Sequence, residues 1–480
     1  MEHKFKRYFY SKLKETVEEK KFAVLTGPRK CGKTVALEQL HEEYPSSEYI
    51  NFRDYEGNID KIYEIYEKIE NSILNHDNSI YLLDEYTHAE KPEAEMNKIA
   101  LAFSKIENNN VTIIFTGSDS TSLENWATRT FSSQIKIIET NFINYAEWLD
   151  YKMINTVSEE TYKQFVLEVS DFYHFEDMKT YLKSCLDETI TSNAHIDRYN
   201  FLTDIDNVTE DSLLNLCYST LYSLHNSMTV QKFYQKDRLH RDLGHLYTKE
   251  KKKIGNDEFY GRIDKFYQER SYAIRNYDYD EIRQSLVYLS NCGLITFTPF
   301  SDDGKNIPNI LNDLYKGKGN KENLFKTFNI TINYPMFYIA IVKDILKDDM
   351  PNDIPDTLLG SIIECHLRGL LSTTGCYEHR EVEVTDNKTK MYEVDIVNPM
   401  KKIGIEISKA NKELKKVNLN RLPDDYEKIL LTNNVTTELE NMNMFTYYDF
   451  IYAASYAHAI DEEFMFSNDK WLSGKGDWQI

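Results

Sequence analysis

A strand–loop–helix pattern near the amino terminus is the feature that most constrains this chain. Residues 27–34 read GPRKCGKT and match G-x-x-x-x-G-K-T, the phosphate-binding P-loop. The apolar run 22–26 precedes the loop and is typical of a buried strand, and residues 35–40 after it favour a helix. Backbone N–H groups of such a loop and of the following helix can surround a phosphate. The segment therefore predicts a nucleoside triphosphate site on the parallel sheet of a P-loop NTPase.

Two motifs supply the predicted chemistry of this site. We expect Lys33 to reach the β- and γ-phosphates and Thr34 to hold Mg²⁺. A short apolar strand at 80–83 ends in Asp84 and Glu85, which we expect to bind Mg²⁺ and to activate the attacking water, respectively. The predicted nucleotide-binding residues of the loop are Gly27, Pro28, Arg29, Lys30, Cys31, Gly32, Lys33, Thr34 and Val35.

A third strand, at 111–116, leads into small hydroxyl residues. Thr116 and Ser118 follow a strand of the predicted sheet at the edge where α/β proteins bind ligands. Either residue could therefore sense the γ-phosphate. Ser118 and Ser120 fit equally well as the N-cap of the next helix, and the sequence leaves both interpretations open.

Composition limits the class of protein. The chain has 480 residues, of which 41% are apolar and 28% charged, as expected for a globular protein of roughly two to four domains. No apolar run approaches the ~18 residues of a membrane span, and the amino terminus leads into no signal-peptide core. The six cysteines are scattered and have no zinc spacing, which indicates reduced thiols. We expect a cytoplasmic protein with no membrane partner.

The charge of the chain bears on its partners. A net charge of −21 argues against a protein that coats nucleic acid over its whole surface. Two basic segments, 236–253 and 401–416, leave room for a local basic face, although solvated charged faces are more usual.

The predicted organisation is α/β and multidomain. Strands near 22–26, 47–52, 79–83, 111–116 and 135–139 alternate with helices, which predicts a parallel sheet covered on both faces. Residues 151–270 show helical periodicity. A helix at 279–289 and a strand at 294–300, joined by a turn, are typical of the end of a winged helix. The predicted domains are a P-loop ATPase domain at 1–150, a helical domain at 151–270, a winged-helix-like domain at 271–345 and a restriction-endonuclease-like α/β domain at 346–480.

The last domain carries its own constellation of acids. A helix at 358–371 precedes strands at 376–384, 392–397 and 403–407. Asp395 and Glu406 on adjacent strands, with Glu364 on the helix, form a predicted divalent-metal site. In the restriction-endonuclease-like arrangement D…E-x-K, the metal activates water beside a lysine. Here Ser408 replaces that lysine, and Lys409 falls on the opposite face of the strand unless a bulge restores it. We expect a degenerate nuclease.

With these motifs in place, the chain resembles the bacterial and archaeal AAA-type ATPases that carry a carboxyl-terminal restriction-endonuclease-like domain of unknown function. The shared elements are GPRxxGKT at 27–34, LLDE at 82–85 and TGS at 116–118, with weaker matches along the rest of the chain. The resemblance implies an adenine nucleotide. It also implies that Arg7, in the helix before the loop, belongs to the nucleotide site and that Arg129 is an arginine finger.

These interpretations lead to three functional hypotheses. The first is an ATPase that uses ATP and Mg²⁺ as a nucleotide-dependent switch, and whose winged helix or last domain binds DNA or a protein without cutting. The second is an ATP-licensed, metal-dependent DNA nuclease that uses Asp395 and Glu406. The third is a scaffold that binds ATP and never hydrolyses it. An arginine finger acting in trans would imply a homo-oligomer.

Overall fold

The computed structural model describes most of the chain and divides it into two compact units. One unit comprises Met1–Asn144 and Tyr181–Glu210, and the other comprises Tyr145–Thr180 and Asp211–Ile480. In the described part of the chain, no helix is both long and apolar enough to cross a membrane. The described residues are 5–89, 97–102, 110–118, 120–131, 134–173, 178–191, 279–302, 305–306, 309, 313, 328–346, 354, 356–371, 376–385, 388–408, 418–433 and 442–460.

The first unit is built on a five-stranded parallel sheet with strand order β2-β3-β4-β1-β5. The sequence prediction of five alternating strands is confirmed. The strands are β1 (Phe22–Thr26), β2 (Glu48–Asn51), β3 (Ile80–Asp84), β4 (Thr112–Thr116) and β5 (Ile135–Glu139). The helices are α1 (Tyr10–Glu18), α2 (Lys33–Glu43), α3 (Ile59–Leu74), α5 (Ser120–Phe131) and α8 (Met178–Thr191), with short 3₁₀ turns η1 (Phe52–Tyr55) and η2 (Tyr86–His88).

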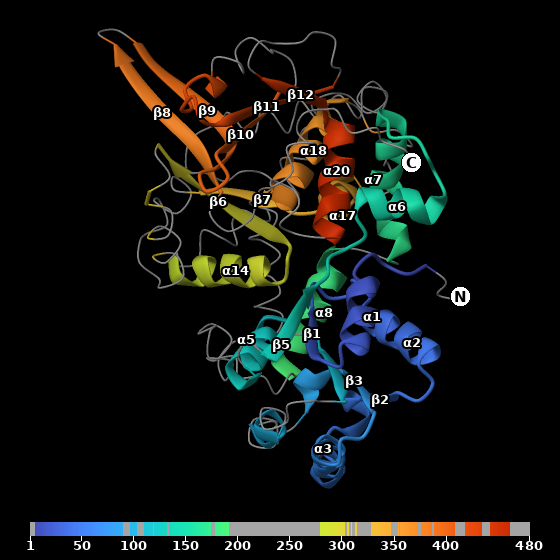
Figure 1. Ribbon diagram of the computed structural model, residues 1–480. Coiled ribbons are helices and arrows are strands. Elements are labelled where there is room, and N and C mark those ends of the chain that lie inside the picture. Colours follow the sequence, from blue (N-terminus) through green and yellow to red (C-terminus); the bar gives the residue numbers. More distant parts are fainter. Residues whose placement is uncertain are drawn as a thin grey trace. The chain divides into compact units, whose positions relative to one another are not determined.

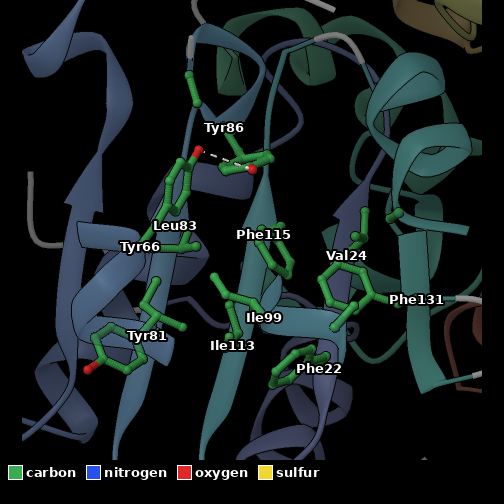
Figure 2. Packing of buried hydrophobic residues seen from close by; sticks show 14 of the residues in the cluster. Phe22, Val24, Tyr66, Tyr81, Leu83, Tyr86, Ile99, Ile113, Phe115 and Phe131 are labelled. Atoms are coloured by element: carbon green, nitrogen blue, oxygen red, sulfur yellow. Dashed lines mark hydrogen bonds between the residues drawn. The ribbon is translucent and has the colours of Figure 1, made fainter. Parts of the chain in front are cut away.

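The central strands are buried on both faces, which explains their continuous apolar sequence. Alternate residues of β1 enter two separate cores: Phe22 and Val24 lie in one, and Ala23 and Leu25 lie in the other. Figure 2 shows the first core, in which the ring of Phe22 meets that of Phe131 edge to face at 5.4 Å. Packing on both faces fixes the register of the strands relative to one another. The candidate site lies at their carboxyl ends.

The second unit contains a seven-stranded mixed sheet with strand order β12-β11-β10-β9-β8-β6-β7. Its longest strands, β8 and β9, form an antiparallel ribbon (Figure 1). The strands are β6 (Ile295–Ser301), β7 (Phe328–Ile332), β8 (Tyr377–Thr385), β9 (Lys388–Asn398), β10 (Ile403–Ile407), β11 (Glu427–Thr432) and β12 (Asn443–Thr446). The helices are α6 (Tyr145–Lys152), α7 (Glu159–Phe172), α14 (Tyr279–Asn291), α17 (Pro335–Leu346), α18 (Asp356–Leu371) and α20 (Tyr447–Ile460).

The predicted helix and strand at 279–300 are confirmed as α14 and β6. Strand β6 pairs antiparallel with β7 and, through Phe300 and Ser301, parallel with β8. The same sheet thus joins strands from either side of the predicted boundary at residue 345. The winged-helix and restriction-endonuclease-like assignments, and the domain boundaries, stay predictions. The basic segment 236–253 and Lys409 lie outside the described residues, as do most of 151–270.

Candidate functional site

The P-loop connects β1 to α2 and comes very close to the neighbouring backbone. At Gly27, whose φ is +142°, an added Cβ would lie 2.2 Å from the backbone oxygen of Thr140. No side chain fits there, so this position requires glycine. Lys30 and Gly32 also have positive φ, at 63° and 97°, and α2 begins directly after Gly32. These conformations wrap the loop around the start of the helix.

Lys33 points its ammonium group back into the loop. Its Nζ donates hydrogen bonds to the backbone oxygens of Gly27 at 2.8 Å and Pro28 at 2.9 Å, and the Cys31 Sγ lies 3.9 Å away. The side chain is buried. The ammonium group of Lys33 thus lies against the loop backbone at the N-terminus of α2, where an anionic ligand is favoured. The structure thus places the predicted phosphate-binding lysine within the loop itself.

Arg7 supports the loop from the segment before α1. Its guanidinium donates to the backbone oxygens of Cys31 and Asn141, each at 2.8 Å. Arg7 therefore connects the P-loop to the segment after β5. These two hydrogen bonds to backbone oxygens hold the loop in place, and the guanidinium also lies over the Phe9 ring, 5.4 Å from its centroid.

Asp84 is buried at the end of β3 and faces two hydroxyl groups. The Tyr49 hydroxyl donates to the Asp84 Oδ2 at 2.7 Å, and the Thr34 side chain also hydrogen-bonds to Asp84. Burial raises the pKa of Asp84, and the neighbouring charge of Glu85 adds to this rise, whereas the Tyr49 and Thr34 hydrogen bonds oppose it. The predicted Mg²⁺ ligands Thr34 and Asp84 are thus brought together. Their oxygens are the donors that Mg²⁺ prefers, so the residues fit this ion.

Glu85 lies beside Asp84 in the left-handed region, with φ 50° and ψ 41°. Its carboxylate accepts hydrogen bonds from the Ser118 hydroxyl, which lies 2.9 Å from Oε1 and 2.8 Å from Oε2. The Ser118 backbone N–H also donates to Oε2, at 3.2 Å, and the Arg53 Nη2 lies 3.6 Å from Oε1. Non-glycine residues rarely adopt this backbone conformation outside functional or tightly packed sites. Here it points the carboxylate toward the end of β4.

The end of β4 contributes a second hydroxyl group. Thr116 is fully buried, and its Oγ1 has no hydrogen-bond partner within the described residues. On the other side of Ser118, the Arg29 Nη1 lies 3.4 Å from the Ser118 Oγ. The hydroxyl of Tyr181, in α8, donates to the Arg29 backbone oxygen at 3.3 Å. Ser118 therefore connects the P-loop arginine to Glu85.

Two predicted residues lie at the margin of this arrangement. Arg129 is exposed on α5, and Val35 is half-buried on the first turn of α2. Nothing in the described contacts tests the arginine-finger role of Arg129, which stays a prediction.

Sequence reasoning missed two residues of this site, Tyr49 and Arg53. Tyr49 lies in β2, and Arg53 lies in the 3₁₀ turn that follows it. Strand β2 pairs with β3 in a register that places Asn51 beside Asp84. The carboxyl ends of parallel strands share an edge, so the end of the predicted strand 47–52 was the signal that could have found them.

The three acids predicted to bind a metal in the second unit contact protein groups, and Glu406 does not share the partner of the other two. Glu364 and Asp395 both lie near the guanidinium of Arg368, at 3.5 Å and 3.4 Å, and Glu378 is a third carboxylate at this group. Glu406 is fully buried and accepts a hydrogen bond from Asn418 at 2.8 Å. In the described part of the chain, no group of three His, Cys, Asp or Glu side chains is arranged to hold a metal ion.

Comparison with known proteins bears on the first unit. Residues 19–149 match the family model of an AAA domain, a range that covers all five strands of the parallel sheet and less than half of the chain. The match and the parallel sheet support a P-loop NTPase fold and a nucleotide-binding role for this unit. A search of curated proteins gives no match.

Two solved structures align weakly with the chain. A RuvB mutant from Thermotoga maritima is 12% identical over 43% of this chain and 73% of its own, with a TM-score of 0.24. A signal transduction ATPase with numerous domains (STAND) protein with a tetratricopeptide repeat sensor, from Pyrococcus horikoshii, is 13% identical. That alignment covers 74% of this chain and 59% of the other, with a TM-score of 0.22. Both TM-scores are too low to support an assignment of function.

Proposed function

We propose that the first unit binds ATP with Mg²⁺ and hydrolyses it, and that the nucleotide state acts as a switch. One observation carries this proposal: the neighbouring carboxylates of Asp84 and Glu85, at the carboxyl end of β3, have different hydrogen-bond partners. Asp84 contacts the Thr34 hydroxyl of the P-loop, and Glu85 is held by Ser118. Hydrolysis of a phosphoanhydride requires both a charge clamp and an oriented water molecule.

Each residue has a distinct role in this proposal. Lys33 exchanges its bonds to the loop carbonyls for bonds to phosphate oxygens. Thr34 and Asp84 supply oxygens for Mg²⁺, which when bound neutralises charge on the phosphates. Glu85 accepts a proton from the attacking water, and Ser118 holds its carboxylate in place. In this proposal Thr116, which ends β4 and whose buried hydroxyl has no partner in the described residues, contacts the γ-phosphate or the water.

Chain connectivity supports a switch. Residues Tyr145–Thr180 belong to the second unit, so the chain leaves the first unit after Asn144 and returns to it at Tyr181. Arg7 bonds both the P-loop and Asn141, which lies just before the first of these crossings. A rearrangement of the loop on nucleotide binding would therefore act on the segment that leads into the second unit. That unit, in this proposal, binds DNA or a protein partner and does not cut.

Phosphate release tests the proposal. Purified full-length protein is mixed with ATP and Mg²⁺, and phosphate is measured for the wild type, Glu85→Gln and Glu67→Gln. Glu67 is exposed on α3 and serves as the matched control. We expect Glu85→Gln to slow release ~10²–10⁴-fold, the range for loss of a general base, with ATP affinity kept. A wild type that binds ATP and releases no phosphate over hours would contradict hydrolysis and favour the scaffold hypothesis.

A further inference from the structure

Three carboxylates of the second unit surround one buried guanidinium. Arg368, on α18, is 2% exposed at its side chain. Its Nη1 lies 3.2 Å from the Glu378 Oε2, and its Nη2 lies 3.4 Å from the Asp395 Oδ1. The Nε of the same group lies 3.5 Å from the Glu364 Oε1, one helical turn earlier on α18. The Nη1 also donates to the Asp395 backbone oxygen at 2.9 Å.

The guanidinium offsets part of the negative charge of these three carboxylates, and Arg380, whose Nη2 lies 2.9 Å from the Glu378 Oε1, adds a second cation. An isolated buried guanidinium is costly, and so are carboxylates that face one another without a cation. Burial disfavours the charged form of Arg368, but the carboxylates of Glu378, Glu364 and Asp395 outweigh it and raise the pKa of the side chain. Arginine is always protonated in proteins. The cluster therefore contains a permanent cation that belongs to the chain.

Two further oxygens of the predicted metal site accept hydrogen bonds from the protein. The Asp395 Oδ2 accepts a hydrogen bond from the backbone N–H of Ile407 at 2.8 Å. The Glu406 Oε1 accepts one from the Asn418 side chain at 2.8 Å. A divalent cation at Asp395 and Glu364 would need several oxygens at about 2.0–2.6 Å. The guanidinium of Arg368 already lies against oxygens of both residues. The residues present do not fit a divalent ion.

We infer that Arg368 takes the place, at Glu364 and Asp395, of the divalent cation that the sequence pattern predicts there, while Glu406 is bound by Asn418. The second unit has the acidic residues of a metal site, but the guanidinium of Arg368 lies where the metal ion would bind. No metal-activated water forms at Asp395, and the unit binds without cutting. The inference deepens the proposed role of this unit and is independent of the ATPase activity, because none of its residues belongs to the first unit.

Manganese binding tests the inference on the intact protein. Bound Mn²⁺ is counted by electron paramagnetic resonance, without nucleotide, in the full-length wild type and in Asp395→Asn. We expect the two proteins to bind the same number of ions, since any ion at the P-loop is common to both. A wild-type Mn²⁺ ion that Asp395→Asn loses would overturn the inference. Plasmid nicking with Mg²⁺ or Mn²⁺ that disappears in Asp395→Asn would overturn it as well.

A second variant asks whether Arg368 is the excluding group. In Arg368→Ala we expect one additional Mn²⁺ site and a melting temperature that rises with Mn²⁺, and both effects should disappear in Arg368→Ala/Asp395→Asn. Arg421→Ala is the matched control, because Arg421 pairs with Glu381 and Glu383 at the surface and its loss should create no site. A folded Arg368→Ala that gains no ion contradicts the exclusion. If that variant does not fold, the wild-type and Asp395→Asn comparison still decides.

Discussion

The hydroxyl of Ser118 lies within 2.9 Å of both carboxylate oxygens of Glu85, and its backbone N–H donates to one of them. Ser118 follows β4, whereas Glu85 follows β3, and the two strands are neighbours in the sheet. A carboxylate held from an adjacent strand has little rotational freedom. This arrangement favours a role for Ser118 in positioning Glu85 over a role as a helix N-cap alone, and it can be tested.

Replacement of Ser118 by alanine should slow hydrolysis and leave binding intact. The variant keeps the backbone N–H bond to Glu85 but loses the hydroxyl, so the carboxylate is less well oriented. We expect phosphate release to fall on the order of tenfold, which corresponds to about 1.4 kcal/mol. Ser120→Ala, at the first residue of α5, is the control. Weaker ATP binding at an unchanged rate would instead assign Ser118 to nucleotide binding.

Arg7→Ala should weaken both the first unit and its nucleotide site. The variant removes two hydrogen bonds from a charged group to the Cys31 and Asn141 oxygens. Each such bond contributes about 1.5–3 kcal/mol, so urea unfolding should show a loss of at least this size, with lower ATP affinity. Lys6→Ala removes an exposed ion pair with Glu43 and should change stability little. Equal effects of the two variants would contradict the bracing role of Arg7.

Gly27→Ala should disrupt the P-loop. A methyl group there would lie 2.2 Å from a backbone oxygen, so either the loop or the segment at Thr140 must move. We expect ATP binding to be lost and the melting temperature to fall. Gly57→Ala is the matched control, because Gly57 also has positive φ, at 74°, but has no atom near the added Cβ. ATP binding by Gly27→Ala at the level of Gly57→Ala would show that the close approach is unimportant.

His366 should make the second unit sensitive to acid. Its Nδ1 lies 2.9 Å from the Tyr162 hydroxyl, and burial lowers its pKa to about 3. Below pH ~6.5 the His366 imidazole binds a proton in the unfolded chain but stays neutral in the folded chain. The free energy of unfolding therefore falls as the pH drops from ~6.5 toward 3. Between about pH 7 and pH 5 this contributes about 2 kcal/mol. Urea unfolding should show a smaller drop for His366→Gln, and an identical drop would contradict the assignment.

The parallel sheet could be predicted because its strands are marked locally. The central strands β1, β3 and β4 are short, mostly apolar runs, and the predicted run 22–26 coincides with β1. By contrast, β11, β12 and α20 were not foreseen. Their assignment depends on pairing with β10 and on packing among residues distant in sequence, which local periodicity does not encode.

Some contacts of the predicted site residues could be foreseen from the sequence, and others could not. The pairing of Thr34 with Asp84 followed from the rule that carboxyl ends of parallel strands meet at one edge. The contacts of Arg368 did not, because a helix and two strands bring Glu364, Glu378 and Asp395 to it from different parts of the sequence. A metal-site motif records which acids are present. It does not record that an arginine of the preceding helix lies among them.

Equilibrium binding of ATP with Mg²⁺ to the wild type and to Lys33→Ala tests the central claim most directly. Lys61→Ala is the control, since Lys61 is exposed on α3 and pairs with Glu64. The ammonium group of Lys33 bonds two backbone oxygens of the loop, so we expect its loss to abolish measurable binding while Lys61→Ala binds as the wild type does. Unchanged ATP affinity in a folded Lys33→Ala would contradict the nucleotide site and the switch built upon it.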